Sequence, residues 1–187
     1  MREDFRILIV CTANIVRSPM AEVIARAMLR SSSCPILVTS AGTHARAGHP
    51  MAPYALAALE NLGLNGSGHH ARPLDNALVK DADLILTMET GHRGSAVTME
   101  PSAMHKAFTL QEFAHLSEGR KIRHLSDTVG RAHAVVRAVA RRRGAPIRRH
   151  PTEIADPYGE PPEEYERCAR VIGGSLSRVL GELLGPR

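Results

Sequence analysis

The sequence predicts an α/β protein in which helices cover both faces of a parallel β-sheet, a three-layer α/β/α arrangement. Two observations predict this fold class. Short apolar runs rich in β-branched residues are typical of buried parallel strands, and they alternate with longer segments whose apolar residues recur at helical spacing. The chain has 187 residues, which is enough for one well-packed core and too few for two comfortable domains. We therefore predict a single domain over residues 1–187.

The first unit of the chain is predicted to be a strand, a tight loop and a helix. Phe5 to Val10 is a continuous apolar run and is expected to form a buried strand. Ser18-Pro19 favours a helix start, with Ser18 as the N-terminal cap and Pro19 in the first turn. Ligands of open α/β sheets bind beyond the carboxyl ends of the strands, which is where the loop from Cys11 to Ser18 lies.

The remaining elements continue the alternation. Further strands are predicted at 36–40, 84–88 and 107–110, and helices at 54–62, 74–80, 122–139 and 162–184. An extended Arg-rich segment occupies the region around residues 117–151. Its part at 140–151 combines Arg, Gly and Pro and is predicted to be a mobile loop.

Composition and charge argue against several classes of protein. The net charge is +5, and five arginines within residues 141–149 account for all of it. The charge is therefore a local patch, expected to be solvated rather than to dock an acidic partner, and not the mark of a nucleic-acid binder. No run of about 18 apolar residues occurs and the N-terminus lacks a signal-peptide pattern, so we expect no membrane insertion. Three cysteines suggest no disulfide framework and favour the reducing cytoplasm.

The loop from Cys11 to Ser18 carries the strongest functional signal. Cys11 and Arg17 flank five residues, and a helix follows. Such a loop can turn its backbone N–H groups toward one phosphate at the positive end of the helix, and Arg17 can close the cradle with a bidentate fork. The same field favours a thiolate, so Cys11 can attack phosphorus and form a phosphocysteine. The proposed phosphate-binding positions between these two residues are Thr12, Ala13, Asn14, Ile15 and Val16.

Two features strengthen this hypothesis beyond a bare Cys-x5-Arg match, for which a buried structural cysteine is the plain alternative. Ser18 can donate its hydroxyl to the Cys11 sulfur. Asp156-Pro157-Tyr158 offers a general acid for the leaving group, because Pro157 restricts Asp156 to extended conformations and so fixes where its carboxyl points. Taken alone, this tripeptide would be an ordinary turn.

Together these residues resemble the low-molecular-weight protein tyrosine phosphatase family in its bacterial, actinobacterial-like form. The matching segments are VCTANIVRSPMAE at 10–22, SAGT at 40–43, HHAR at 69–72, DADLILTM at 81–88 and DPY at 156–158. The resemblance implies a phosphatase I-like fold, with four parallel strands in the order 2-1-3-4. It also implies a two-step phosphocysteine mechanism that uses neither a metal nor a cofactor.

The resemblance also implies roles for individual residues. It makes Cys11 the nucleophile, Arg17 the phosphate clamp and Asp156 the general acid. Ser18 stabilises the thiolate. Loop shape is held by Asn14 with the help of Ser40 and the histidine of the HxAR motif, which is His69. His70 is an adjacent alternative that physical reasoning does not separate from His69.

The chain departs from the family pattern at several positions. Ala13 replaces a usual glycine, which would strain the loop if the backbone needs a positive φ. Val16 stands where a second cysteine is often found, and Cys34 and Cys168 fall on unrelated predicted elements, so we expect no disulfide to rescue oxidised Cys11. The substrate wall is reduced to Tyr158 and Arg46, which can stack on a ring or pair with an acidic substrate flank.

The most favoured function is a protein-tyrosine phosphatase acting on a phosphorylated protein, such as a tyrosine kinase or its substrate. A phosphatase of a small phosphate ester is the alternative. Arsenate reductase is less favoured because it needs further paired cysteines. A protein-arginine phosphatase is less favoured because such relatives tend to have Thr where Ile15 stands. A non-catalytic phospho-ligand module does not explain why both Cys11 and Asp156 are present. The oligomeric state stays open.

Overall fold

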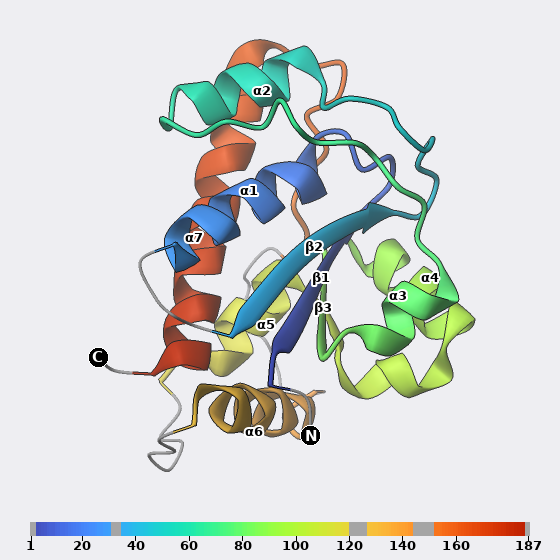
Figure 1. The fold of residues 1–187 in the computed structure, drawn as a ribbon, viewed down its shortest axis with the longest axis vertical. Coiled ribbons are helices and arrows are strands. Elements are labelled where there is room, and N and C mark those ends of the chain that lie inside the picture. The colour runs from blue at the N-terminus through green and yellow to red at the C-terminus, as the bar shows by residue number, and fades with distance from the viewer. Residues whose placement is uncertain (1–2, 31–34, 120–126, 144–151, 186–187) are drawn as a thin grey trace.

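A parallel sheet forms the centre of the fold (Figure 1). A computed structural model describes residues 3–30, 35–119, 127–143 and 152–185. The strands β1 (Phe5–Cys11), β2 (Ile36–Gly42), β3 (Leu84–Thr87) and β4 (Ala107–Thr109) lie in the order β2-β1-β3-β4. Each neighbouring pair is parallel. The predicted fold class and strand order are confirmed.

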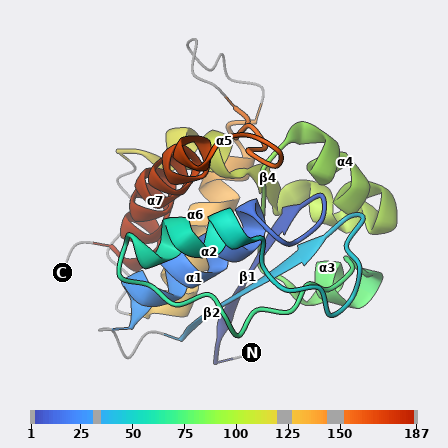
Figure 2. The same ribbon diagram turned by 90° about the horizontal axis from the view of Figure 1, so that it is seen from above.

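Helices cover the sheet on both faces (Figures 1 and 2). One face carries α1 (Arg17–Leu29), α2 (Pro53–Glu60), α5 (Leu110–Ser117), α6 (Thr128–Ala140) and α7 (Pro162–Leu184). The other carries α3 (Asn76–Asp81), α4 (Thr90–Met99) and the 3-10 turn Pro101–His105. Within the described ranges, no helix is long and apolar enough to cross a membrane.

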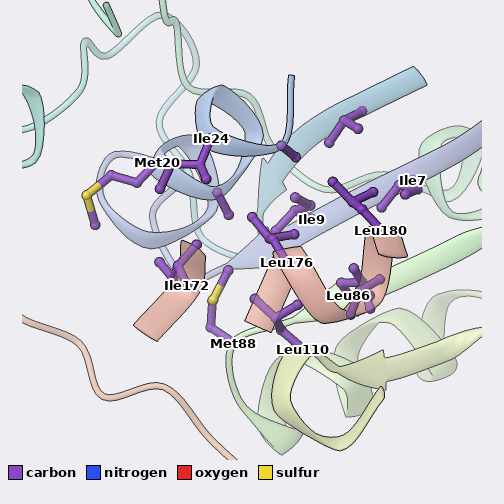
Figure 3. Packing of buried hydrophobic residues seen from close by; sticks show 14 of the residues in the cluster. Ile7, Ile9, Met20, Ile24, Leu86, Met88, Leu110, Ile172, Leu176 and Leu180 are labelled. Atoms are coloured by element: carbon purple, nitrogen blue, oxygen red, sulfur yellow. The ribbon is translucent and has the colours of Figure 1, made fainter. Parts of the chain in front are cut away.

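Alternation along β1 divides the core into two parts. Ile7 and Ile9 pack into the larger cluster with α1 and α7, whereas Leu8 and Val10 face the smaller cluster under α3 and α4. Figure 3 shows Leu176 and other side chains of α7 lying among those of β1 and α1. Aromatic residues make up only 3% of the chain, so aliphatic side chains from several helices must fill this space.

The structure corrects the predicted start of α1. Val16, not Ser18, occupies the N-cap position, and no side chain caps this end. Ser18 instead lies inside the first turn, and its hydroxyl is 3.0 Å from the Cys11 sulfur. The Ser18 side chain thus contacts the loop that precedes the helix and does not cap the helix, so the Ser-Pro pattern predicted the wrong N-cap.

Two helices escaped prediction. In α4 only His92 and Ala96 are buried, and the helix contains two glycines, so its apolar periodicity is weak. The strand predicted at 107–110 ends at Thr109, and α5 follows directly from Leu110. Thr109 is the N-cap of α5 and forms a capping box with Glu112. Ile122 and Leu125, expected to start α6, lie outside the described residues; the helix begins at Thr128.

The Arg-rich stretch is not simply solvated, so that expectation is wrong for Arg142 and Arg143. Arg142 donates to the Leu116 carbonyl at 3.1 Å. Arg143 donates to two backbone carbonyls, and its guanidinium lies 4.2 Å from the centre of the Phe108 ring. Burial lowers the pKa of Arg143. Arg142 thus ties the end of α6 to α5, and Arg143 ties it to β4. The rest of the predicted mobile loop, residues 144–151 with Arg148 and Arg149, lies outside the described residues.

Val179 and Val171 of α7 form a matched pair that tests this packing. Val179 is fully buried, whereas Val171 is 38% exposed. We expect Val179→Ala to lower the free energy of unfolding by about 2 kcal/mol, because it removes two buried methyl groups and leaves a cavity. Val171→Ala changes helix propensity equally but should cost less than about 0.5 kcal/mol. Urea denaturation measures both, and equal losses would contradict the burial of this helix face.

Candidate active site

The candidate site lies where β1 ends and α1 begins. Residues 12–16 turn between Cys11 and Arg17, beyond the carboxyl end of the sheet. Asn14 has a φ of 55°, and it is the one non-glycine residue with a positive φ in the described ranges. Asn tolerates this conformation better than most residues. Ala13 needs no positive φ, so replacing the usual glycine there causes no such strain.

The Asn14 side chain, which is fully buried, holds the loop from behind. Its Nδ2 donates to the hydroxyls of Ser18 and Ser40, each at 2.9 Å. Its Oδ1 accepts from the Arg72 backbone N–H at 2.9 Å. Every polar atom of this amide is therefore used, and the left-handed conformation is locked by contacts from three different segments.

His69 contacts the loop, and His70 does not. The Nε2 of His69 lies 2.7 Å from the Asn14 carbonyl oxygen. Because a carbonyl only accepts, this nitrogen must carry the ring proton. The Nδ1 of His70 lies 3.4 Å from the Gly48 carbonyl instead. The structure thus separates two histidines that the sequence left as alternatives.

Arg17 is a buried cation held by two carboxylates. Its side chain is 1% exposed and forms ion pairs with Glu89 and, at 2.6 Å, with Asp156. It also donates to the Ile154 carbonyl at 2.9 Å. Burial acts to lower the pKa of Arg17, but the two carboxylates outweigh it and the pKa is raised. Its Nε is buried without a hydrogen-bond partner, which suits an incoming oxyanion.

Hydrogen bonds at the β3–α4 junction position the Asp156 segment. The Ile154 N–H donates to the Met88 carbonyl at 2.9 Å. Glu153 accepts from the backbone N–H and the hydroxyl of Thr90, at 2.9 and 2.5 Å. These bonds lower the pKa of Glu153. They fix the backbone immediately before Asp156, so its carboxylate meets Arg17 above the loop.

Glu89 and His92 are site residues that the sequence analysis missed. Glu89 directly follows the DADLILTM segment at the carboxyl end of β3, and that place alone could have marked it. His92 is 5% exposed, and its Nε2 lies 2.9 Å from the Thr12 hydroxyl. Burial, reinforced by Arg17, lowers the pKa of His92 against the opposing pull of Glu89. Its contact with the loop depends on α4, which the sequence did not predict.

A cavity of about 470 Å³ opens over the loop. It is lined by Cys11, most of the loop and Arg17, with Asp156 and Tyr158 on one wall. Arg46 lines it too, together with His44 and His49, which sequence reasoning did not select. Ser18, Ser40 and His69 lie behind the loop instead. No group of three or more His, Cys, Asp or Glu side chains in the described part of the chain can hold a metal ion.

Cys168, in α7, does not line this cavity; it borders a neighbouring pocket that Asp156 also lines. Burial raises the pKa of its thiol to about 12. Cys34, the other cysteine considered in the sequence, lies outside the described residues.

Gly42, at the end of β2, lies directly beneath the loop. A Cβ there would sit 2.5 Å from the Thr12 carbonyl oxygen and 2.8 Å from the Asn14 nitrogen, both of them backbone atoms. We expect Gly42→Ala to displace the loop at a cost of about 1–3 kcal/mol, and so to weaken inorganic phosphate binding about tenfold or more. Titration calorimetry measures the affinity. Gly68→Ala is the control, because nothing lies within 4 Å of its added Cβ; equal affinities for both variants would contradict the close packing.

Known proteins resemble this chain over most of its length. The family model described as low molecular weight phosphotyrosine protein phosphatase matches residues 6–142. A probable low molecular weight protein-tyrosine-phosphatase, EpsP of Ralstonia nicotianae, is 39% identical over 106 residues, 57% of this chain and 70% of its own. A protein-arginine-phosphatase of Geobacillus stearothermophilus is 33% identical over 180 residues, 96% of each chain.

Solved structures agree with the sequence matches. The low molecular weight protein tyrosine phosphatase from T. tengcongensis has a TM-score of 0.73 and 29% identity, and the match covers 95% of this chain and 98% of that one. The YwlE arginine phosphatase from Geobacillus stearothermophilus has a TM-score of 0.71 and 26% identity, with 96% and 92% covered. The resemblance noted from the motifs is confirmed: the chain belongs to the low molecular weight phosphotyrosine protein phosphatase family.

Proposed function

We propose that this protein hydrolyses phosphotyrosine in proteins through a phosphocysteine formed on Cys11. One observation carries the proposal. The Cys11 sulfur lines a cavity at the N-terminal end of α1, 3.0 Å from the Ser18 hydroxyl, with Arg17 and Asp156 paired in the same cavity. A thiolate, an oxyanion cradle, a fixed cation and an acid are the groups that phosphoryl transfer needs.

In the first step the phosphate binds to the backbone N–H groups of the loop and to Arg17. The Cys11 thiolate attacks phosphorus in line, a sulfur–phosphorus bond forms and the bond to the ester oxygen breaks. Asp156 donates its proton to that oxygen, and the tyrosine hydroxyl leaves. Asn14, Ser40 and His69 do not touch the phosphate; they keep the loop in shape while charge shifts.

In the second step water attacks the phosphocysteine. Asp156, now a carboxylate, accepts a proton from the water, and the sulfur–phosphorus bond breaks. Cys11 leaves as a thiolate. Ser18 accepts a hydrogen bond from Asn14, and its single hydroxyl hydrogen has two acceptors within reach, the Ala41 carbonyl at 3.3 Å and the Cys11 sulfur at 3.0 Å. Turned toward the sulfur, it stabilises the returning charge.

A protein-arginine phosphatase is the second candidate, because the relative that aligns over 96% of both chains carries that name. Ile15 favours phosphotyrosine, which is a phosphate ester, over phosphoarginine. It lines the cavity with an apolar side chain, which packs against an aryl ring but offers a guanidinium no hydrogen bond. Peptides bearing phosphotyrosine or phosphoarginine, assayed side by side, distinguish the two. We also propose that residues 1–187 form a single domain. Its proposed partners are cytoplasmic phosphoproteins, among them a tyrosine kinase or its substrate.

Cys11→Ser should reduce turnover of p-nitrophenyl phosphate by about 10³-fold or more, because it removes the nucleophile. Cys168→Ala is the matched control. Burial raises the pKa of the Cys168 thiol to about 12, so it remains protonated, and its loss should leave kcat within about twofold. Steady-state kinetics test this, and a Cys11→Ser enzyme as fast as wild type would rule out the covalent mechanism.

Asp156→Asn should lower kcat for phosphotyrosine by about 10²-fold or more, and much less for p-nitrophenyl phosphate, whose leaving group needs no proton. Glu89→Gln controls for the lost ion pair, since Glu89 also pairs with Arg17. This variant should slow both substrates to a similar extent. If Asp156→Asn also slows both substrates equally, Asp156 is not the general acid.

A further inference from the structure

One part of the cavity lining carries the permanent positive charge of Arg46 beside two histidines. The loop that follows β2, residues 43–50, reads THARAGHP and contains no acidic residue. Three of its side chains, His44, Arg46 and His49, are exposed and line the same cavity as Cys11. We call these three residues the cationic rim. Tyr158, which is 65% exposed, also lines the cavity.

The rim is held at a fixed place relative to the nucleophile. The backbone N–H of Thr43 donates to the Cys11 carbonyl at 2.9 Å, and that of His44 donates to the Thr12 carbonyl at 2.8 Å. At the far end of the loop, the Gly48 and Ala71 N–H groups donate to the carbonyls of Ala71 and His49, each at 2.8 Å. Both ends of the loop are therefore hydrogen-bonded to the rest of the fold, which fixes the position of the rim.

No carboxylate in the described part of the chain neutralises this rim. The Arg46 side chain forms no hydrogen bond or ion pair with the residues that the structure describes, and it is exposed. Asp156 is the acidic residue among those that line the cavity, and it is paired with Arg17. The positive charge of the rim is consequently available to a group outside the protein.

We propose that the cationic rim selects phosphotyrosine substrates in which acidic residues flank the phosphotyrosine. The proposal rests on the proposed function, since the phosphate must first bind in the loop. With the phosphate in the loop, the peptide leaves the cavity between Tyr158 and the rim. A neighbouring carboxylate then meets Arg46, whose planar fork matches it. An exposed ion pair of this kind is expected to change affinity about two- to fivefold.

Three phosphotyrosine peptides that differ only in their flanks test this selection. The flanking positions are all glutamate, all glutamine or all lysine. We expect kcat/KM to fall in that order, with a ratio of about threefold or more between the glutamate and glutamine peptides in ~0.05 M NaCl. The ratio should approach one in ~0.5 M NaCl, because salt screens exposed charges. Equal kcat/KM for these two peptides at low salt overturns the proposal.

Arg46→Gln should bring kcat/KM for the glutamate peptide close to that for the glutamine peptide. Arg178→Gln is the matched control. Arg178 is exposed and lies about 24 Å along α7 from Pro162, so the same loss of charge there should preserve the preference for the glutamate peptide. If Arg46→Gln slows p-nitrophenyl phosphate as much as the glutamate peptide, Arg46 supports the loop and does not read the flank. That result also overturns the proposal.

Binding of the same peptides to Cys11→Ser separates this proposal from the proposed function. Fluorescence anisotropy should rank their affinities as glutamate, glutamine and lysine. If wild type hydrolyses no phosphotyrosine peptide but the variant still shows this ranking, hydrolysis of phosphotyrosine fails and the rim proposal stands. If the variant binds all three equally, the rim proposal fails whatever the wild type hydrolyses.

Discussion

The buried amide of Asn14 is the constraint on which the rest of the site depends. A phosphate loop works only if consecutive N–H groups point to one place, which requires a backbone turn that most residues resist. Here one residue takes the left-handed conformation, and three hydrogen bonds from Ser18, Ser40 and Arg72 hold it there. Because none of these contacts involves the phosphate, the cradle is complete before a ligand arrives, and little reorganisation is needed on binding.

Arg17 connects this loop to the rest of the active site. Its guanidinium joins the loop after β1, the junction after β3 and the segment at 153–156, which are far apart in the sequence. Removing either carboxylate would leave a buried cation partly unpaired, which is costly. The same group that is proposed to hold the phosphate therefore also positions the proposed acid, Asp156. In the proposed mechanism, phosphate binding and proton transfer are therefore linked through this one side chain.

The residues of the rim differ in burial from those behind the loop. Behind the loop Asn14, Ser18 and Ser40 are buried and hydrogen-bonded to one another, whereas the rim of His44, Arg46 and His49 is exposed on a loop with fixed ends. The backbone of this loop is bonded at both ends and Arg46 is exposed, which suits the proposed recognition of charge next to the phosphate. The residues that support the loop and those proposed to set specificity thus lie on opposite sides of residues 12–16.

The sequence by itself determined the fold class, and it singled out the loop from Cys11 to Ser18 and Asp156 as candidate site residues, because each follows from a local pattern: apolar runs, a helix start after a strand, and a proline that restricts its neighbour. Local patterns also misled, since Ser18 has the chemistry of a cap but its hydroxyl faces sulfur. Only the tertiary structure decided between His69 and His70, brought Glu89 to Arg17 and placed His92 against Thr12. Those contacts join residues more than fifty positions apart, and no local propensity encodes which distant side chains the packing of the helices brings together.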